Sequence, residues 1–213
     1  MKKFLRHEYD DIGRIYIFDD GSKYYSVTTM LGATGDKKFL VAWKKRIGVQ
    51  RAEAITRCAT NTGNIVHECL EQYLLGNEVQ YPNAVIKMLV RQIIPYIDKY
   101  ISKVYHTEQI LYSSLLNLAG TADGIVDYND EFMVLDFKTS RRVPKISWIT
   151  DYFIQLFIYS KMIEEMYGTR PKKGVLLFCY KEQRSRNNQI IVNLDKYESS
   201  AMKRIELFHN QTQ

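Results

Sequence analysis

Apolar residues recur along this chain with two different periods, which separate predicted strands from predicted helices. Short runs rich in Val, Ile, Leu, Phe and Tyr are typical of β-strands, and they lie at 14–18, 24–28, 103–112, 118–128, 131–138, 174–180 and 189–193. Apolar residues three and four positions apart predict helices, at 39–47, 50–59, 65–75, 82–100, 148–167 and 195–208. Interleaved strands and helices favour an α/β fold, in which a mixed central sheet is flanked by helices and preceded by an N-terminal helical segment.

Two interruptions set the limits of the predicted helices. The segment 61–64, Asn-Thr-Gly-Asn, has the composition of a loop, so the sequence predicts two helices around it. Pro95 should kink or end the helix at 82–100, because proline lacks the backbone N–H that a helix interior needs.

The two segments 118–128 and 131–138 predict an antiparallel hairpin. Asn129 and Asp130 join them, and both residue types tolerate the left-handed geometry of tight hairpin turns. Counting outward from this turn places Asp123 opposite Asp136. Opposed residues on paired strands have Cβ atoms about 4.5 to 5.5 Å apart, and like charges at that distance are destabilising.

Lys138 offers an explanation for this acidic pair. Side chains alternate between the two faces of a strand, so Lys138 projects from the same face as Asp136. The three charges could form a solvated face of the hairpin, since exposed charge is common. They could also surround a divalent cation, because Mg²⁺ prefers carboxylate and carbonyl oxygens as ligands.

The hairpin residues, with three others at wider spacing, resemble the core motif of the PD-(D/E)XK nucleases in the RecB-like branch. The similarity is greatest to mitochondrial genome maintenance exonuclease-like proteins and phage exonucleases. The matching residues are Gly120, Asp123, Asp136-Phe137-Lys138-Thr139, an upstream His67, and a downstream Gln155 with Tyr159. The resemblance implies a restriction-endonuclease-like core within the α/β fold.

The resemblance also implies a metal site. One or two Mg²⁺ or Mn²⁺ ions would polarise the phosphate and lower the pKa of a bound water. The ligands implied for them are His67, Asp123, Asp136 and the backbone carbonyl of Phe137. Glu108, on the strand before the hairpin, would complete this shell or bind a second ion, although a surface ion pair with a lysine fits it equally well.

Three further residues would take part in catalysis by the same resemblance. Lys138 would orient the attacking water or stabilise developing charge. Gln155 and Tyr159, four positions apart on the helix that follows, would lie over the active site and help to position the lysine or the nucleic acid.

Net charge favours a polyanionic partner, which the resemblance implies is DNA. Thirty Lys and Arg against 24 Asp and Glu give a formal charge of +6, which attracts a polyanion through counterion release. Arg141, Arg142 and Lys145 follow the catalytic strand and are candidates for binding phosphates near the scissile bond. Arg51 is a further candidate, and an ordinary exposed helix arginine explains it equally well.

Cysteine count and hydropathy exclude several classes of protein. Three cysteines without CxxC spacing predict neither a zinc site nor a disulfide framework, and branches of the family that carry an iron–sulfur cluster need four. We therefore expect no iron–sulfur cluster. No apolar run suits a membrane span or a signal segment, so a cytoplasmic protein without a membrane partner is expected.

The predicted function is that of a metal-dependent DNA exonuclease, acting on single-stranded ends or flaps in replication, recombination or repair. A structure-specific endonuclease would use the same residues. A non-catalytic nucleic-acid-binding protein of this fold would usually lack one of the two aspartates or the lysine, and all three are present. The expected organisation is one nuclease domain over 1–213, with a hairpin and helical part at 1–100 and the catalytic core at 101–213. No GxxxxGK[ST] motif is present, which favours a free-standing nuclease of the kind that phages use.

Overall fold

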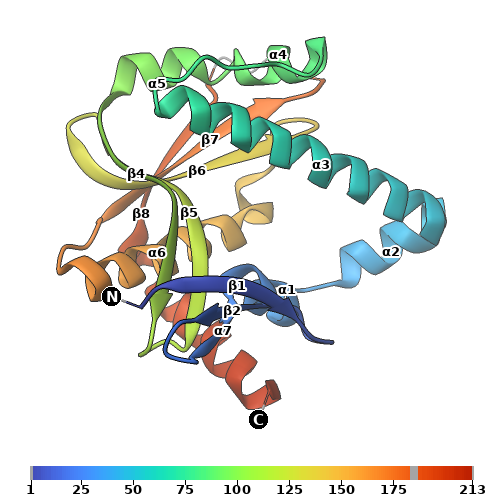
Figure 1. The fold of residues 1–213 in the computed structure, drawn as a ribbon. Coiled ribbons are helices and arrows are strands. Elements are labelled where there is room, and N and C mark those ends of the chain that lie inside the picture. The colour runs from blue at the N-terminus through green and yellow to red at the C-terminus, as the bar shows by residue number, and fades with distance from the viewer. Residues whose placement is uncertain (1, 183–186, 213) are drawn as a thin grey trace.

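A computed structural model describes residues 2–182 and 187–212 (Figure 1). Its strands are β1 (Phe4–Tyr9), β2 (Arg14–Phe18), β3 (Lys23–Ser26), β4 (Ile101–Ser113), β5 (Leu118–Tyr128), β6 (Glu131–Ser140), β7 (Lys173–Tyr180) and β8 (Gln189–Asn193). Its helices are α1 (Val27–Thr34), α2 (Lys38–Ile47), α3 (Val49–Leu74), α4 (Ala84–Val90), α5 (Ile94–Tyr100), α6 (Thr150–Tyr167) and α7 (Glu198–Thr212). Two short 3₁₀ turns, η1 (Ile146–Trp148) and η2 (Leu194–Tyr197), precede α6 and α7.

The strands form one mixed sheet. Its eight strands follow the order β1-β2-β3-β5-β6-β7-β8, and β4 pairs with β5 outside this path. The pairs β3 with β5 and β6 with β7 are parallel, and the other pairs are antiparallel. The predicted mixed sheet flanked by helices is therefore confirmed, and the arrangement is consistent with a restriction-endonuclease-like fold.

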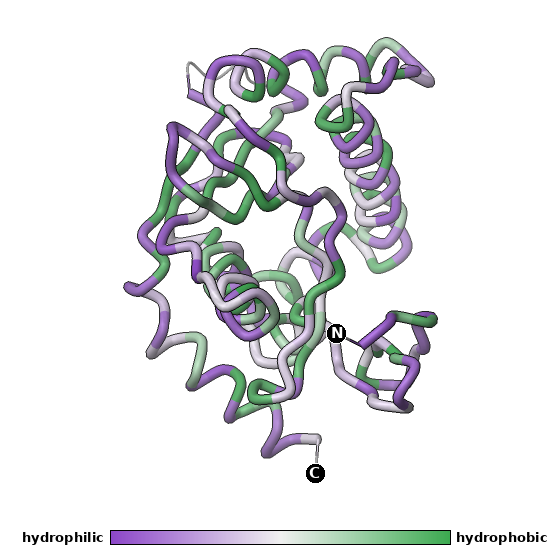
Figure 2. The backbone as a smooth tube through the Cα atoms, turned by 60° about the vertical axis from the view of Figure 1, so that its left-hand side comes forward, coloured by the Kyte–Doolittle hydropathy of each residue, from purple (hydrophilic) through white to green (hydrophobic). Residues whose placement is uncertain are grey.

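Two apolar layers hold helices against the sheet. On one face α1, α6 and α7 pack in a core that includes Phe157, and on the other α3, α4 and α5 pack around Leu70. Val134 and Leu135 follow each other on β6 and belong to opposite layers, as the alternation of a strand requires. Figure 2 shows green, hydrophobic segments along the central strands between these helices. Among the described residues, none of the helices combines the length and the apolar character needed to cross a bilayer.

The hairpin of β5 and β6 forms as expected. Asn129 and Asp130 have φ angles of 52° and 59°, the left-handed values that a two-residue turn of type I′ needs at both positions. Tyr128 pairs with Glu131 and Val126 with Met133, as predicted, but the pairing ends at Gly124 and Leu135, one residue before Asp123 and Asp136. β5 has the predicted limits, and β6 begins at the predicted residue but ends two residues later than predicted, at Ser140.

Beside β5 the sheet forks. β4 pairs along the whole of β5, but on the opposite edge β3 reaches only Leu118 and Ala119, and β6 pairs only from Gly124 onward. Within the described chain, no strand pairs with this edge of β5 at residues 120–123. The fork therefore leaves an opening in the sheet that side chains from both helical layers can reach.

The predicted helix boundaries are wrong in the N-terminal half. Residues 61–64 do not separate two helices, because α3 continues through them for 26 residues. Thr62 bonds back to the carbonyl of Cys58 inside that helix, at 2.8 Å. The segment 82–100 divides into α4 and α5, and Pro95 lies in the first turn of α5, where its missing N–H costs nothing.

Two elements were not anticipated, and one predicted loop is only partly described. β1 has no clear alternation of apolar and polar residues and is largely exposed. α1 begins at Ser26, whose side chain accepts the N–H of Thr29 and so caps the helix. The polar and basic composition of 181–188 predicts a loop, and residues 183–186 of it lie outside the described residues.

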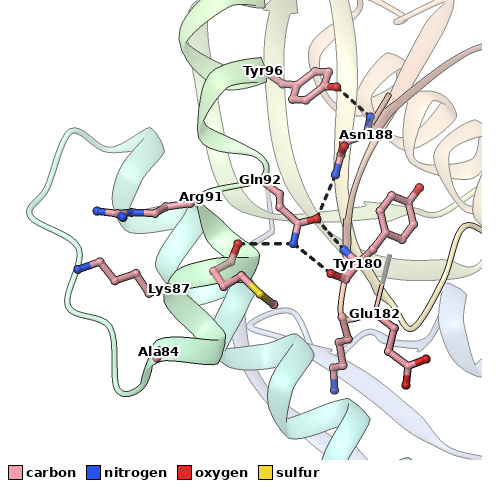
Figure 3. Close-up of a pocket in the computed structure, with 10 residues that line it drawn as sticks. Ala84, Lys87, Arg91, Gln92, Tyr96, Tyr180, Glu182 and Asn188 are labelled. Atoms are coloured by element: carbon pink, nitrogen blue, oxygen red, sulfur yellow. Dashed lines mark hydrogen bonds between the residues drawn. The ribbon is translucent and has the colours of Figure 1, made fainter. Parts of the chain in front are cut away.

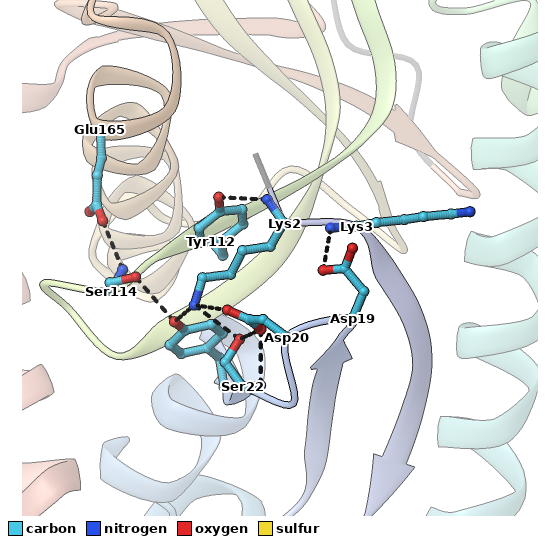
Figure 4. Close-up of polar contacts among 9 residues, drawn as sticks. Lys2, Lys3, Asp19, Asp20, Ser22, Tyr112, Ser114 and Glu165 are labelled. Carbon is cyan, nitrogen blue, oxygen red and sulfur yellow. Dashed lines mark hydrogen bonds and ion pairs between the residues drawn. The ribbon is translucent and has the colours of Figure 1, made fainter.

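The N-terminal residues are tied to two turns of the sheet (Figure 4). Lys2 Nζ donates to the hydroxyl of Tyr24 at 2.7 Å and pairs with Asp20 at 2.9 Å. The backbone N–H of Lys2 donates to the hydroxyl of Tyr112 at 3.0 Å. The hydroxyl of Tyr24 also lies 3.1 Å from that of Ser114. These contacts fix the start of β1 against the far end of β4 although most of the strand is exposed.

Candidate active site

A cleft of about 500 Å³ opens where the sheet forks. It is lined by side chains from β2, α1, α3, β4, β5, β6 and α6, namely Arg14, Thr28, Asn64, His67, Glu68, Glu71, Glu108, Thr121, Asp123, Asp136, Lys138, Gln155 and Tyr159. The structure thus brings together seven of the predicted site residues, which are His67, Glu108, Asp123, Asp136, Lys138, Gln155 and Tyr159.

Asp123 links β5 to β6 and to α3 through its carboxylate. It is 7% exposed, and its Oδ2 accepts the backbone N–H of Phe137 at 2.6 Å. The same oxygen lies 3.2 Å from Nδ1 of His67 on α3. Burial alone would raise the pKa of Asp123, but His67, Lys138 and the Phe137 N–H outweigh it and lower that pKa. Burial likewise opposes charge on His67, yet attraction to Asp123 raises its pKa.

Asp136 and Lys138 form a buried ion pair two residues apart on β6. Lys138 Nζ lies 2.5 Å from Oδ2 of Asp136, a carboxylate that is only 2% exposed. The ammonium sits outside hydrogen-bond geometry, so Oδ2 has no hydrogen-bond partner in the described structure. Burial, with a smaller contribution from Asp123, raises the pKa of Asp136 to about 6 against the opposing effect of Lys138. Burial disfavours the charge of Lys138, but the two aspartates raise its pKa, and it stays protonated.

Glu108 reaches this acidic pair from a distorted position on β4. Its neighbours Thr107 and Gln109 pair with Gly124 and Ala122, so Glu108 lies opposite Asp123. Its φ of 42° is in the left-handed region, which is strained for a residue with a long side chain. Partial burial of the carboxyl group and repulsion from Asp123 raise the pKa of Glu108 to about 7.

Gln155 and Tyr159 hold Lys138 from the α6 side. Lys138 Nζ donates to Oε1 of Gln155 at 3.4 Å, and Nε2 of Gln155 donates to the Tyr159 hydroxyl at 3.0 Å. The ammonium also lies 4.6 Å from the centre of the Tyr152 ring. A Cβ at Gly120 would fall 2.5 Å from Tyr159, so a glycine is needed for the tyrosine to approach β5 this closely.

The donor set of the cleft fits a divalent cation. Ligand atoms of His67, Glu108 and Asp123 lie within 4.8 Å of one another. Asp136 adds a buried carboxylate oxygen that lacks a hydrogen bond. Imidazole nitrogen with carboxylate oxygens suits Mn²⁺ and, through the carboxylates, Mg²⁺. An added positive charge would also relieve the repulsion that raises the pKa of Glu108.

Several cleft residues were not found from the sequence. Arg14 on β2 and Thr28 on α1 belong to the N-terminal hairpin region, and their guanidinium and hydroxyl groups lie 3.4 Å apart. No motif marks them, because only the parallel pairing of β3 with β5 brings that region to the cleft. Glu71 had a visible signal, since it lies one helical turn after His67 on the same face.

The predicted phosphate-binding residues lie outside the cleft. Arg51 is on the exposed first half of α3. Arg141 and Arg142 pair with Glu182 at 2.5 and 3.4 Å. Lys145 lies over the ring of Trp148, 5.3 Å from its centre. Phe137 contributes its backbone N–H to Asp123, whereas the prediction concerned its carbonyl.

A second, larger cavity of about 720 Å³ lies between α4 and the end of β7 (Figure 3). Gln92 occupies its floor, where it donates to the carbonyl of Tyr180 and accepts its N–H, both at 3.0 Å. Asn188 donates to Gln92 at 3.3 Å and to the carbonyl of Phe178 at 2.6 Å. The side chains of Gln92 and Asn188 thus have hydrogen-bond partners at the end of β7. We therefore assign them a structural role and not a catalytic one.

Comparison with protein-family models and with curated protein sequences yields no match for this chain. Among solved structures, a candidate exonuclease from Eubacterium rectale aligns with a TM-score of 0.51 and 16% identity. The alignment covers 70% of this chain and 65% of the other, which is less than two thirds of its length. The protein SSO0001 aligns with a TM-score of 0.39 and 17% identity, over 78% and 69% of the two chains. The similarity to the candidate exonuclease is therefore a similarity of fold.

Proposed function

We propose that this protein is a metal-dependent deoxyribonuclease of the RecB-like PD-(D/E)XK type, which hydrolyses phosphodiester bonds from the ends of single-stranded DNA. The observation that carries the proposal is the cleft itself, in which two aspartates, a glutamate, a histidine and a buried lysine converge from four elements. The fold likeness to a candidate exonuclease supports the same conclusion.

The residues in the cleft would have different roles in hydrolysis. His67, Glu108, Asp123 and Asp136 would hold Mg²⁺ or Mn²⁺, which when bound polarises the phosphate and acidifies water. Lys138 is charged and fixed, and its Nζ can donate to the attacking water or to a phosphate oxygen as negative charge develops there.

Three residues that are not predicted metal ligands have positioning or binding roles. Gln155 orients Lys138 through its Oε1, and Tyr159 orients Gln155 in turn. Arg14 is the other basic side chain that lines the described cleft besides Lys138 and His67, and its planar guanidinium suits two phosphate oxygens at once. A phosphate bound between Arg14 and Lys138 would lie over the carboxylates.

The decisive experiment is digestion of DNA labelled at the 5′ or the 3′ end, as single strands, duplexes and closed single-stranded circles, with and without Mg²⁺. We expect cation-dependent loss of linear single strands, with circles left intact. Cleavage of circles would favour a structure-specific endonuclease. Binding of DNA without cleavage in Mg²⁺ or in Mn²⁺ would identify a non-catalytic DNA-binding protein.

Two variants connect cleavage to the cleft. Asp136→Asn and Lys138→Ala should each reduce the rate by at least about 10² to 10³-fold, because the first removes a ligand of the cation and the second removes a positive charge at the reacting phosphate. Strand binding should be retained. Asp127→Asn is the matched control, since Asp127 is on the same strand as Asp123 but bonds the hydroxyl of Tyr105 at 2.9 Å. Undiminished cleavage by Asp136→Asn would exclude the mechanism.

A further inference from the structure

The net positive charge of the protein is concentrated in one projecting arm. We define the basic arm as residues 36–60, which comprise α2 and the first half of α3. It contains seven Lys and Arg and two Asp and Glu, so +5 of the total charge of +6 lies in this segment. From residue 53 to residue 60 every side chain is exposed, and Figure 1 shows the arm extending away from the sheet.

Two aromatic rings lie exposed at the base of this arm. Phe39 on α2 and Trp148 on η1 are 74% and 69% exposed. Their ring centres are 6.3 Å apart and their planes differ by 27°, so the two rings form a stacked pair. Lys145 Nζ lies 5.3 Å from the centre of the Trp148 ring. Phe39, Trp148 and Lys145 form what we call the aromatic platform.

Burial does not account for this arrangement. Phe and Trp are usually buried in large part, and the contact between the two rings covers only a small fraction of each. Val41 and Ile146, on the same two elements, are exposed as well. Large exposed apolar side chains that gather beside cations are typical of a binding surface.

Arg204 on α7 fixes the two halves of the platform relative to each other. Its guanidinium donates to the carbonyl of Leu31 at 2.6 Å and to Thr34 at 2.5 Å, both near the end of α1 just before the arm. It also donates to Asp151 at 2.9 Å, in the first turn of α6 directly after Trp148. The segments that carry Phe39 and Trp148 are therefore joined through one side chain.

The platform is connected along the chain to both walls of the cleft. Trp148 lies between Lys138 on β6 and Gln155 on α6. Phe39 follows α1, whose Thr28 lines the cleft. The segments that carry the platform are thus continuous along the chain with the elements that hold the candidate active site.

We propose that the aromatic platform stacks on unpaired bases of a DNA strand whose backbone follows the basic arm toward the cleft. This inference rests on the proposed function for the identity of the strand. An aromatic face accepts any base by stacking, and the arm supplies the charge that a polyphosphate backbone requires. A base-paired duplex hides its base faces, so the platform favours single strands. A neutral protein partner would leave the +5 charge without a counterpart.

Fluorescence anisotropy with labelled strands tests the platform separately from catalysis. The full chain is titrated in EDTA into a 20-nucleotide oligothymidylate and into an abasic strand with the same number of phosphates. Phe39→Ala and Trp148→Ala should each weaken binding of oligothymidylate by roughly 5- to 100-fold. Affinity for the abasic strand should stay unchanged, because that strand has phosphates but no bases.

Two controls separate stacking from charge and from misfolding. The double substitution Lys44→Gln, Lys45→Gln should weaken binding of the two strands equally and reduce the salt dependence of their affinities. Tyr9→Ala, which removes another exposed aromatic ring, should change neither affinity. In a Trp43→Phe background, oligothymidylate should also quench the fluorescence of Trp148, which reports stacking without truncating the platform.

Equal loss of affinity for both strands, or no loss for either, would overturn the stacking role. A change of oligomeric state in Phe39→Ala or Trp148→Ala without a change in strand binding would assign the platform to contacts between copies of the chain, and would likewise overturn it. Failure of the wild-type protein to cleave DNA would count against the proposed function alone, because the binding measurement requires no cation and no turnover.

Discussion

Asp136 and Glu108 carry their charges where the surrounding protein opposes them. Burial raises the pKa of Asp136 to about 6, and its Oδ2 lacks a hydrogen bond. Glu108 adds backbone strain to an unfavourable charge. Such unfavourable features usually persist at functional sites, where a ligand supplies the missing interaction. At the scale of single residues, these features are compatible with a bound cation and cost the metal-free protein stability.

Replacement of Glu108 by Gln and by Asn separates charge from backbone strain. Both substitutions remove the carboxylate and should raise the stability of the metal-free protein at pH 8. Glu108→Asn should be the more stable of the two by up to about 1 kcal/mol, because Asn tolerates the left-handed conformation. Both should bind Mn²⁺ more weakly in calorimetry. Equal stability of the two variants in urea denaturation would mean that the backbone at residue 108 is not strained.

The residues that could be predicted from the sequence are those linked by local geometry. Asp123, Asp136 and Lys138 follow from one turn and the alternation of two strands. Arg14 could not be predicted, because its place in the cleft depends on the pairing of β3 with β5, which joins segments about a hundred residues apart. His67 was found through family resemblance, since nothing in the helix itself distinguishes it.

At the scale of elements, the sequence predicts strands better than it predicts the helix that crosses them. β5, β7 and β8 lie within a residue of their expected limits, because apolar runs end at turn residues. α3 was predicted as two helices, since residues 61–64 are weak helix formers that together cost a few kcal/mol at most. Packing of Val66 and Leu70 against the sheet offsets that cost, and packing of this kind cannot be read from composition.

Gly63→Ala tests whether α3 is continuous through this segment. A Cβ at residue 63 would lie 3.5 Å from Oγ1 of Thr139, an ordinary contact. Alanine should therefore raise the free energy of unfolding by about 0.5 to 1 kcal/mol, as in any helix interior. Gly76→Ala is the control. Gly76 follows the end of α3 with a φ of 74°, which alanine adopts only with strain, so this substitution should lower the free energy of unfolding by a similar amount. A destabilised Gly63→Ala would indicate a break in the helix.

At the scale of the whole molecule, the fork in the sheet makes the site possible. A sheet fully paired on both edges of β5 would separate His67 on one helical layer from Gln155 on the other. Because residues 120–123 have an open edge, side chains from α3 and α6 meet at Asp123 and Lys138. A bound cation would therefore contribute to tertiary structure as well as to chemistry, and its removal should be detectable in global stability.

The stability of the metal-free protein should depend on pH through this cluster. The folded-state pKa values of Asp136 and Glu108, about 6 and 7, lie above their unfolded values, and that of His67 is raised as well. Groups with raised pKa values stabilise the fold below their unfolded pKa, and that stabilisation is lost as pH rises through the folded pKa. Asp123 has a lowered pKa and loses its contribution only in acid, below this range. We therefore expect these groups to lower the free energy of unfolding between pH 5 and about pH 8.

Comparison of the wild type with Asp136→Asn isolates the contribution of the buried Asp136 to this pH dependence of stability. In EDTA, the wild type should lose on the order of 1 to 3 kcal/mol relative to the variant between pH 5 and pH 8. Addition of Mg²⁺ or Mn²⁺ at about 100 times its dissociation constant should restore roughly 2.7 kcal/mol to the wild type at pH 8. At pH 5 the gain should be small, because protons then compete for the carboxylates. A stability difference that stays flat with pH in EDTA would show that the pKa of Asp136 is not raised. A cation effect equal at both pH values would show that the buried carboxylate is not a cation ligand.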